Sequence, residues 1–126
     1  IFEWFKDTNS KFKKDDFYMI YIDLPRNELL KRIEIRTEEM IKNRAISEVR
    51  KLLKLKIPKN KSAYKAIGIK EVKEYLNRKI EIENVIEKIS IKTRQYAKRQ
   101  STWGRGNMEN WKKMNPNSLD KFLKKI

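Results

Sequence analysis

The sequence FYMIYIDLP at residues 17–25 decides how this chain folds. Its first six residues form an unbroken apolar run rich in aromatic and β-branched side chains, which is typical of a β-strand buried on both faces. Pro25 ends the strand, and Asp23 is expected to cap that end. A lone strand leaves its backbone N–H and C=O groups without partners. We therefore expect the strand to need a sheet that this chain supplies only in part.

Beyond Pro25, apolar residues recur at every third or fourth position, which is the period of an amphipathic α-helix. Gly68 interrupts one such segment, so it marks either a helix start or a close approach to the backbone. A short strand or a core anchor is expected at Trp111. Helices are predicted at 27–43, around 46–53, around 67–76, at 81–100 and at 118–125, the last capped by Ser118. The fold class is mainly α, with one or two strands and four or five helices.

The composition excludes several kinds of chemistry. The chain has 126 residues, of which 39% are hydrophobic, and it contains neither Cys nor His. Disulfides, thiolate or imidazole metal sites and His-activated nucleophiles are therefore excluded. Only three glycines are present, and none lies in the Gly-rich pattern of a P-loop. No apolar run approaches the ~20 residues that span a bilayer, so we expect no membrane partner and a cytoplasmic location.

The net charge of +15, from 32 Lys and Arg against 17 Asp and Glu, indicates either a solvated lysine-rich surface or a surface that binds a polyanion. The sequence TRQYAKRQSTWGR at 93–105 favours the second interpretation, because residues 91–106 hold five basic side chains and no acid. Cations neutralise phosphates, and a Trp ring stacks on a base, as an RNA site requires. The alternative is that Tyr96 and Trp103 are core residues and the charges are merely solvated.

A weaker candidate is KAIGIK at 65–70, where two lysines flank Gly68. A phosphate could approach backbone N–H groups there at a helix start, although a simple capped amphipathic helix explains the segment as well. The remaining charged side chains are interpreted as solvated surface groups. On the long helix, the spacing predicts a polar stripe of Lys88, Lys92, Gln95 and Arg99. The carboxylates of Glu34, Glu38 and Glu39 are expected to pair with Arg32 and Arg36, and those of Glu71 and Glu74 with Lys70 and Lys73. No catalytic residue and no metal ligand is assigned.

Several blocks in a fixed order carry a resemblance to a known family. They are YIDLPR at 21–26, LKRIEIR at 30–36, AIGIKE at 66–71 and TRQYAKRQ at 93–100, which Thr102, Trp103 and Arg105 follow. This order resembles the C-terminal part of bacterial tRNA dimethylallyltransferases. That family transfers a dimethylallyl group from its diphosphate to the exocyclic amine of the adenosine on the 3′ side of the tRNA anticodon. The resemblance implies a fragment of a P-loop-like α/β fold.

The resemblance also implies roles for parts of this chain. Residues 1–25 would be the end of the α/β core with its last strand, 26–106 a helical part that faces tRNA, and 107–126 a tail with a helix. The implied tRNA contacts are Lys65, Ala66, Ile67, Gly68, Ile69 and Lys70, together with Lys98, Arg99, Gln100, Ser101, Thr102, Trp103, Gly104 and Arg105. The family implies dimethylallyl diphosphate as substrate, ATP-type nucleotide binding, magnesium and a monomer, but no cofactor is expected on this chain alone.

Some residues depart from the family pattern, since Ile69 stands where Tyr is frequent, Gly104 where Phe or Leu is usual, and Arg44 where Gly is frequent. The chain opens on the apolar cluster Ile1, Phe2, Trp4 and Phe5, so we expect it to be a piece of something longer. The resemblance implies that the phosphate loop and the catalytic Asp lie upstream of Ile1. Three hypotheses follow: the tRNA-binding part of an enzyme completed by an N-terminal half, an autonomous basic RNA-binding helical module, or a non-functional remnant.

Overall fold

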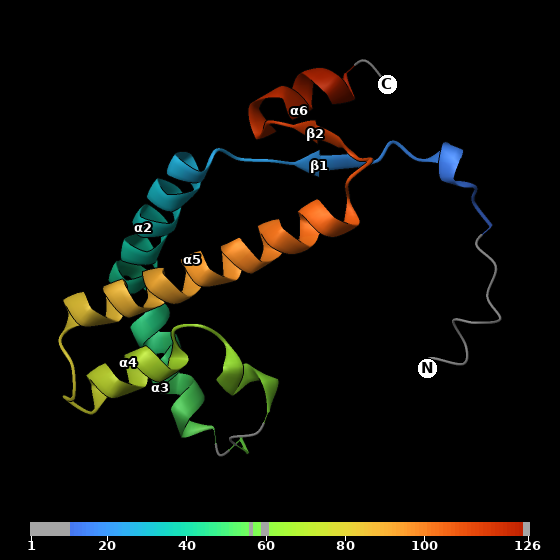
Figure 1. Cartoon of the computed structure of the whole chain (residues 1–126). Coiled ribbons are helices and arrows are strands. Elements are labelled where there is room, and N and C mark those ends of the chain that lie inside the picture. The colour runs from blue at the N-terminus through green and yellow to red at the C-terminus, as the bar shows by residue number, and fades with distance from the viewer. Residues whose placement is uncertain (1–10, 56, 59–60, 125–126) are drawn as a thin grey trace. The chain divides into compact units, whose positions relative to one another are not determined.

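The computed structural model describes residues 11–55, 57–58 and 61–124 (Figure 1). The apolar cluster at residues 1–5 lies outside this range. The elements in chain order are the 3-10 turn η1 (Lys14–Asp16), β1 (Ile20–Ile22), α2 (Arg26–Asn43), α3 (Ala45–Lys54), the 3-10 turn η2 (Ser62–Lys65), α4 (Ile69–Leu76), α5 (Ile82–Asn107), β2 (Lys112–Met114) and α6 (Pro116–Leu123). The predicted mainly α fold class is confirmed.

The described residues divide into two compact units. One contains Leu24–Asn107 and is helical, while the other joins the residues up to Asp23 to those from Met108 onwards. Both stretches with implied tRNA contacts, 65–70 and 98–105, fall in the helical unit.

The smaller unit is built on a two-stranded parallel sheet, in which Ile20 pairs with Lys112 and Ile22 with Met114. The prediction of a strand buried on both faces is wrong for the described residues, because Ile22 of β1 is 43% exposed. Its one strand partner pairs with the backbone edge of β1, whereas burial of both faces of a strand requires elements packed over both of them. A strand near Trp111 is confirmed, and β2 begins at the next residue.

The start of α6 differs from the prediction. Asn115 caps the helix, because its side-chain oxygen accepts a hydrogen bond of 2.9 Å from the N–H of Asn117. Pro116 follows at the first helical position, where its missing N–H costs nothing. The helix therefore begins before Ser118, and the prediction that Ser118 caps it is wrong.

In the helical unit, four helices share one apolar core. Helix α2 packs on α3 and α5, and α4 packs on α3 and α5. Apolar residues at helical spacing meet in the middle, as the periodicity predicted. The buried members of this core are Ile41, Val49, Val72, Val85 and Ile89.

Gly68 connects the turn before α4 to the core. It precedes α4 with a left-handed φ of +105°, a conformation that L side chains rarely adopt. A Cβ added at Gly68 would lie 3.4 Å from Cδ1 of Ile89 on α5. The two interpretations left open for this glycine, a helix start and a close approach, therefore both hold.

Helix α5 continues past its predicted end at Gln100 and finishes at Asn107. The side-chain amide of Asn107 donates a 2.8 Å hydrogen bond to the carbonyl of Trp103, four residues earlier in the last turns of the helix. The two glycines in this last part cost about 1 kcal/mol each relative to Ala, which does not stop a helix. The TRQYAKRQSTWGR segment is therefore helical throughout.

Candidate nucleic-acid interface

The C-terminal half of α5 presents aromatic rings to solvent. Tyr96 is 50% exposed and Trp103 is 59% exposed, so the alternative that both are core residues is wrong. The two side chains are seven residues apart, two turns of an α-helix, and therefore lie on the same side of α5. Arg99 lies between them, with its guanidinium over the Tyr96 ring.

The basic residues of α5 separate into paired and unpaired groups. Lys88 and Lys92 pair with Glu74 and Glu71 of α4, and Arg94 lies 3.8 Å from Glu34 of α2. Within the part of the chain that the structure describes, no acid pairs with a basic residue of α5 beyond Arg94. The unpaired cations are Lys98, Arg99 and Arg105, which are all exposed. The predicted polar stripe therefore divides, because its first two lysines are engaged between helices.

The other implied contact residues of α5 differ in their surroundings. Thr102 is exposed, and its hydroxyl donates a 3.0 Å hydrogen bond to the carbonyl of Lys98, which leaves an oxygen lone pair free to accept. Gln100 is also exposed, whereas Ser101 is partly buried and Gly104 is buried. The exposed set therefore contains both charged and neutral hydrogen-bonding groups.

The segment 65–70 forms the approach to α4. Lys65 ends η2, and Lys65, Ala66 and Ile67 are exposed. Gly68 is buried, and Ile69 packs on the apolar core, while Lys70 in the first turn of α4 is exposed. Lys65 and Lys70 have no acidic partner among the described residues. The two lysines are thus available to an anion, whereas Gly68 and Ile69 pack against the interior of the helical unit.

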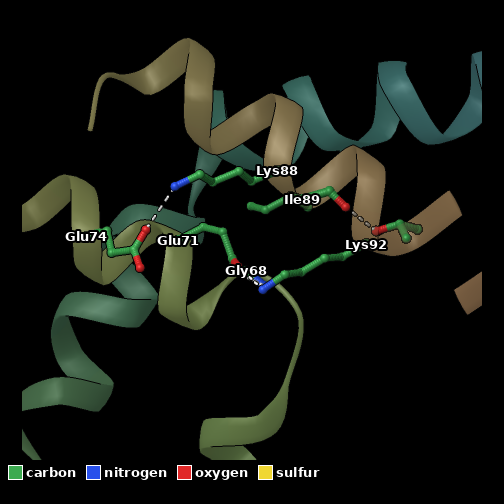
Figure 2. Close-up of polar contacts among 7 residues, drawn as sticks. Gly68, Glu71, Glu74, Lys88, Ile89 and Lys92 are labelled. Carbon is green, nitrogen blue, oxygen red and sulfur yellow. Dashed lines mark hydrogen bonds and ion pairs between the residues drawn. The ribbon is translucent and has the colours of Figure 1, made fainter. Parts of the chain in front are cut away.

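Glu71 is the polar residue that sequence reasoning misjudged most. It was expected at the surface beside Lys70, but it is 2% exposed and faces α5 (Figure 2). Residues one apart on a helix do not face each other, so Lys70 cannot reach it. Its Oε2 accepts a 3.0 Å hydrogen bond from the N–H of Gly68, and its Oε1 accepts one from the ammonium of Lys92. The spacing of Gly68 and Glu71 is that of a helix N-cap and the third helical position, which was the available signal.

The electrostatics of Glu71 follow from this arrangement. Burial raises the pKa of its carboxyl, but the hydrogen bond from Lys92, the hydrogen bonds from backbone N–H groups and the charge of Lys92 together outweigh that effect. The pKa of Glu71 therefore lies below its usual value of 4.5, and the carboxylate is ionised at neutral pH.

A second ion pair runs alongside the first. The ammonium of Lys88, one turn before Lys92, lies 3.2 Å from Glu74 of α4 (Figure 2). The Glu74 side chain is partly buried, and its hydrogen bond is to Lys88, whereas the N–H of Gly68 bonds to Glu71. The predicted partner of Glu74, Lys73, is its immediate neighbour along the helix and points elsewhere. Both predicted pairings on α4 are therefore wrong.

The predicted ion pairs on α2 also have other partners. Glu38 pairs with Lys42 at 3.7 Å, four residues later, and Glu34 pairs with Arg94 of α5. Arg32 and Arg36 each lie two residues from Glu34, and Arg36 lies two residues from Glu38, a spacing at which helical side chains do not meet.

The described residues offer neither a metal site nor a membrane span. Their acidic side chains do not gather in groups of three or more. None of the helices that the structure describes is long and apolar enough to cross a membrane.

Comparison with known proteins matches this architecture to a family. A sequence model described as IPP transferase matches residues 1–107. The tRNA dimethylallyltransferase of Pelagibacter ubique is 48% identical over 126 residues, which is 100% of this chain and 40% of that protein. The same enzyme of a Thermoanaerobacter species is 49% identical over 81 residues, 64% of this chain and 26% of that protein.

Solved structures are similar as well. The tRNA isopentenylpyrophosphate transferase of Bacillus halodurans has a TM-score of 0.70 and 32% identity, covering 90% of this chain and 36% of that one. The Staphylococcus epidermidis enzyme has a TM-score of 0.74 and 31% identity, covering 87% and 38%. The chain thus spans 40% or less of the length of these proteins. Because the family model covers most of its residues, the chain belongs to the IPP transferase family.

Proposed function

We propose that this chain is the tRNA-contacting portion of a tRNA dimethylallyltransferase, and that its helical unit binds the substrate tRNA. The observation that carries the proposal is the division of charges on α5. Cations before residue 95 are neutralised by acids of α2 and α4, whereas Lys98, Arg99 and Arg105 are exposed and unpaired beside Trp103. Unpaired cations beside an aromatic ring suit a phosphate backbone with an unstacked base.

The proposed contacts have distinct roles. Lys98, Arg99 and Arg105 neutralise phosphates, and the Trp103 ring stacks on an exposed base. Thr102 and Gln100 supply neutral hydrogen-bonding groups. Lys65 and Lys70 form a second cationic contact at the start of α4. Both contacts belong to one compact unit, so the helices α4 and α5 hold them together.

Chemistry at the adenine amine needs groups outside the described residues. The family's substrate is dimethylallyl diphosphate, and its reaction requires a base and a diphosphate site. Among the described residues, no group of three or more acids is placed to hold a metal ion. We therefore assign these residues the binding and orientation of tRNA alone, and we expect no prenyl transfer by the isolated chain.

A chimera tests this proposal. The region of the Pelagibacter ubique enzyme that matches this chain is replaced by this chain. Transfer to tRNA is then measured with dimethylallyl diphosphate that carries a label in its dimethylallyl group. The 48% identity over the full 126 residues makes the exchange conservative. We expect the chimera to transfer the group and the isolated chain to transfer none. An inactive but folded chimera would contradict the proposal, and it would favour a non-functional remnant if this chain also failed to bind tRNA.

A second candidate function is an autonomous RNA-binding module. It is favoured by the apolar core of the helical unit, whose buried residues all come from α2, α3, α4 and α5. This candidate predicts cooperative unfolding and salt-sensitive tRNA binding by the isolated chain. The chimera separates the two functions, because a module without an enzymatic role would bind tRNA but would not restore transfer.

A further inference from the structure

The turn before α4 is attached to α5 at two points. Gly68 packs its backbone against Ile89, where an added Cβ would lie 3.4 Å from Cδ1 of that residue. Three residues further along α5, Lys92 donates a hydrogen bond to Glu71, and Glu71 accepts another from the N–H of Gly68 (Figure 2). A continuous chain of polar contacts therefore runs from the backbone at Gly68 through Glu71 to α5.

The two residues of the ion pair that forms this attachment, Glu71 and Lys92, differ in solvent exposure. The Glu71 side chain is 3% exposed, whereas the Lys92 side chain is 45% exposed. A buried carboxylate with one cationic partner is held in a single arrangement, because any other position leaves its charge unpaired. Lys92 is also only six residues before Lys98, about 9 Å along the helix axis. The attachment point thus lies next to the unpaired cations of α5.

We propose that Glu71 and Lys92 are positioning residues, which fix the segment 65–68 relative to the cationic end of α5. The proposal rests on the proposed function only in naming tRNA as the molecule that meets both segments. Two contact segments held at a fixed separation bind one polyanion as a single preorganised surface, without the cost of ordering one of them first. The pair itself contacts no phosphate.

The same geometry limits how the start of α4 binds an anion. Glu71 already occupies the N–H of Gly68, at 3.0 Å. The N–H of Gly68 is therefore not available to a phosphate, and the earlier expectation that a phosphate approaches the backbone at this glycine is wrong for that donor. The exposed side chains of Lys65 and Lys70 remain available to an anion at this segment.

A distance measurement on the full 126-residue chain tests the proposal directly. The chain has no Cys, so Ala66→Cys and Lys98→Cys place two spin labels unambiguously. Pulsed electron double resonance then measures the distance distribution between the segment 65–68 and α5. We expect one narrow distribution in the doubly labelled parent and a broad or shifted one after Lys92→Met. Lys92→Arg keeps a cation and is expected to restore the narrow distribution.

Lys88→Met is the matched control. It removes the ion pair one turn away on the same two helices, but its partner Glu74 does not contact Gly68. We expect it to leave the distribution narrow. Glu71→Gln combined with Lys92→Met covers the case in which Lys92→Met alone fails to fold, because Gln keeps an acceptor for Gly68 and leaves no buried charge. A narrow distribution in this double variant would overturn the proposal.

Binding supplies a second measurement. In the folded variants we expect tRNA affinity to fall about tenfold after Lys92→Met, the size of a coupling within one hydrogen-bond network. Lys65→Ala with Lys70→Ala should weaken tRNA binding when introduced into the original chain, without spin labels. The same two substitutions should change tRNA binding by the Lys92→Met variant little, since the segment 65–68 is no longer held in place. An equal loss of tRNA affinity in the original chain and in the Lys92→Met variant would overturn the proposal. Absence of tRNA binding by the parent would contradict the proposed function instead, and the distance distributions would still decide whether the pair positions the segment.

Discussion

The guanidinium carbon of Arg99 lies 5.7 Å from the centre of the Tyr96 ring, one turn earlier on α5. A cation over an aromatic face is attracted by the ring's quadrupole, so the contact keeps the Arg99 side chain along the helix. Trp103 follows one turn later on the same side of α5. Charge and flat aromatic surface therefore alternate along one exposed face of the helix.

Reversing charge on this face should abolish much of the tRNA affinity. For Lys98→Glu with Arg99→Glu we expect at least about a tenfold loss, with the slope of log affinity against log salt reduced by about 1.4 for two phosphate contacts. Filter binding across a salt series measures both quantities. Arg50→Glu with Lys51→Glu is the matched control, since it reverses an adjacent exposed pair on α3, outside both basic segments. Equal losses in the two variants would mean that only the net charge matters.

Removal of the Trp103 ring should weaken binding without destabilising the fold. The ring is 59% exposed, so little packing is lost in Trp103→Ala. Base stacking on an aromatic side chain contributes about 1–3 kcal/mol, and we expect a loss of tRNA affinity in that range. Trp103→Phe keeps a stacking surface and should retain most of the affinity. A fall in the free energy of unfolding as large as the loss in binding would show that the ring is structural.

Two glycines should respond oppositely to alanine. Gly68→Ala forces a side chain into a φ of +105° against Ile89, and we expect unfolding to become easier by about 1–2 kcal/mol or more. Gly106 lies in the last turns of α5 with open space around an added Cβ, so Gly106→Ala should stabilise the chain by up to about 1 kcal/mol. Urea denaturation measures both. Similar effects of the two substitutions would contradict the assigned backbone conformations.

Stability should depend on the ionisation of Glu71. Its pKa is lower in the folded chain than the usual value of 4.5, so the unfolded chain binds more protons between these two values. The contribution of Glu71 is therefore fully present above pH 4.5 and is lost as the pH falls through the lowered pKa. Urea denaturation at neutral pH and at a series of acidic pH values below 4.5 should show this loss.

The control for this pH dependence is the neutral variant. Glu71→Gln cannot titrate, so the fall in the free energy of unfolding that accompanies protonation of Glu71 should disappear. Glu74→Gln removes the neighbouring ion pair but leaves Glu71 in place, and the fall should remain. A parent and a Glu71→Gln variant with the same pH profile would contradict the folded-state ionisation described above.

The sequence predicted the helical architecture because apolar spacing determines which helix face is buried. Ile41, Val49 and Val85 entered the core as their periodicity indicated. Helix ends were harder to locate, since local hydrogen bonds decide them. Helix α5 ends at Asn107, whose side chain bonds to the carbonyl of Trp103, instead of at Gln100, and Asn115 caps α6 before Ser118. Asn115 followed by Pro116 is the sequence pattern of a helix N-cap and first helical position, so the start of α6 was marked in the sequence, although Ser118 is an equally acceptable cap by residue type.

Ion pairing was the least predictable part of the site. Sequence neighbours suggested partners within each helix, but Glu34, Glu71 and Glu74 pair with α5 instead. Such contacts depend on how helices pack, which the order of residues in one helix does not specify. The exposed state of Tyr96 and Trp103 was left open for the same reason, because an aromatic residue on a helix suits a core and an RNA surface equally well.

The register of the two strands has a consequence for the order of folding. Ile20 pairs with Lys112 in parallel, so the whole helical unit is the crossover connection between two neighbouring strands. Contacts inside the helical unit join residues closer in sequence than the strands, and such contacts form sooner than pairing across more than ninety residues. We therefore expect a nascent chain to form α2, α3, α4 and α5 first, and β1 to pair with β2 only after Met114 has been synthesised.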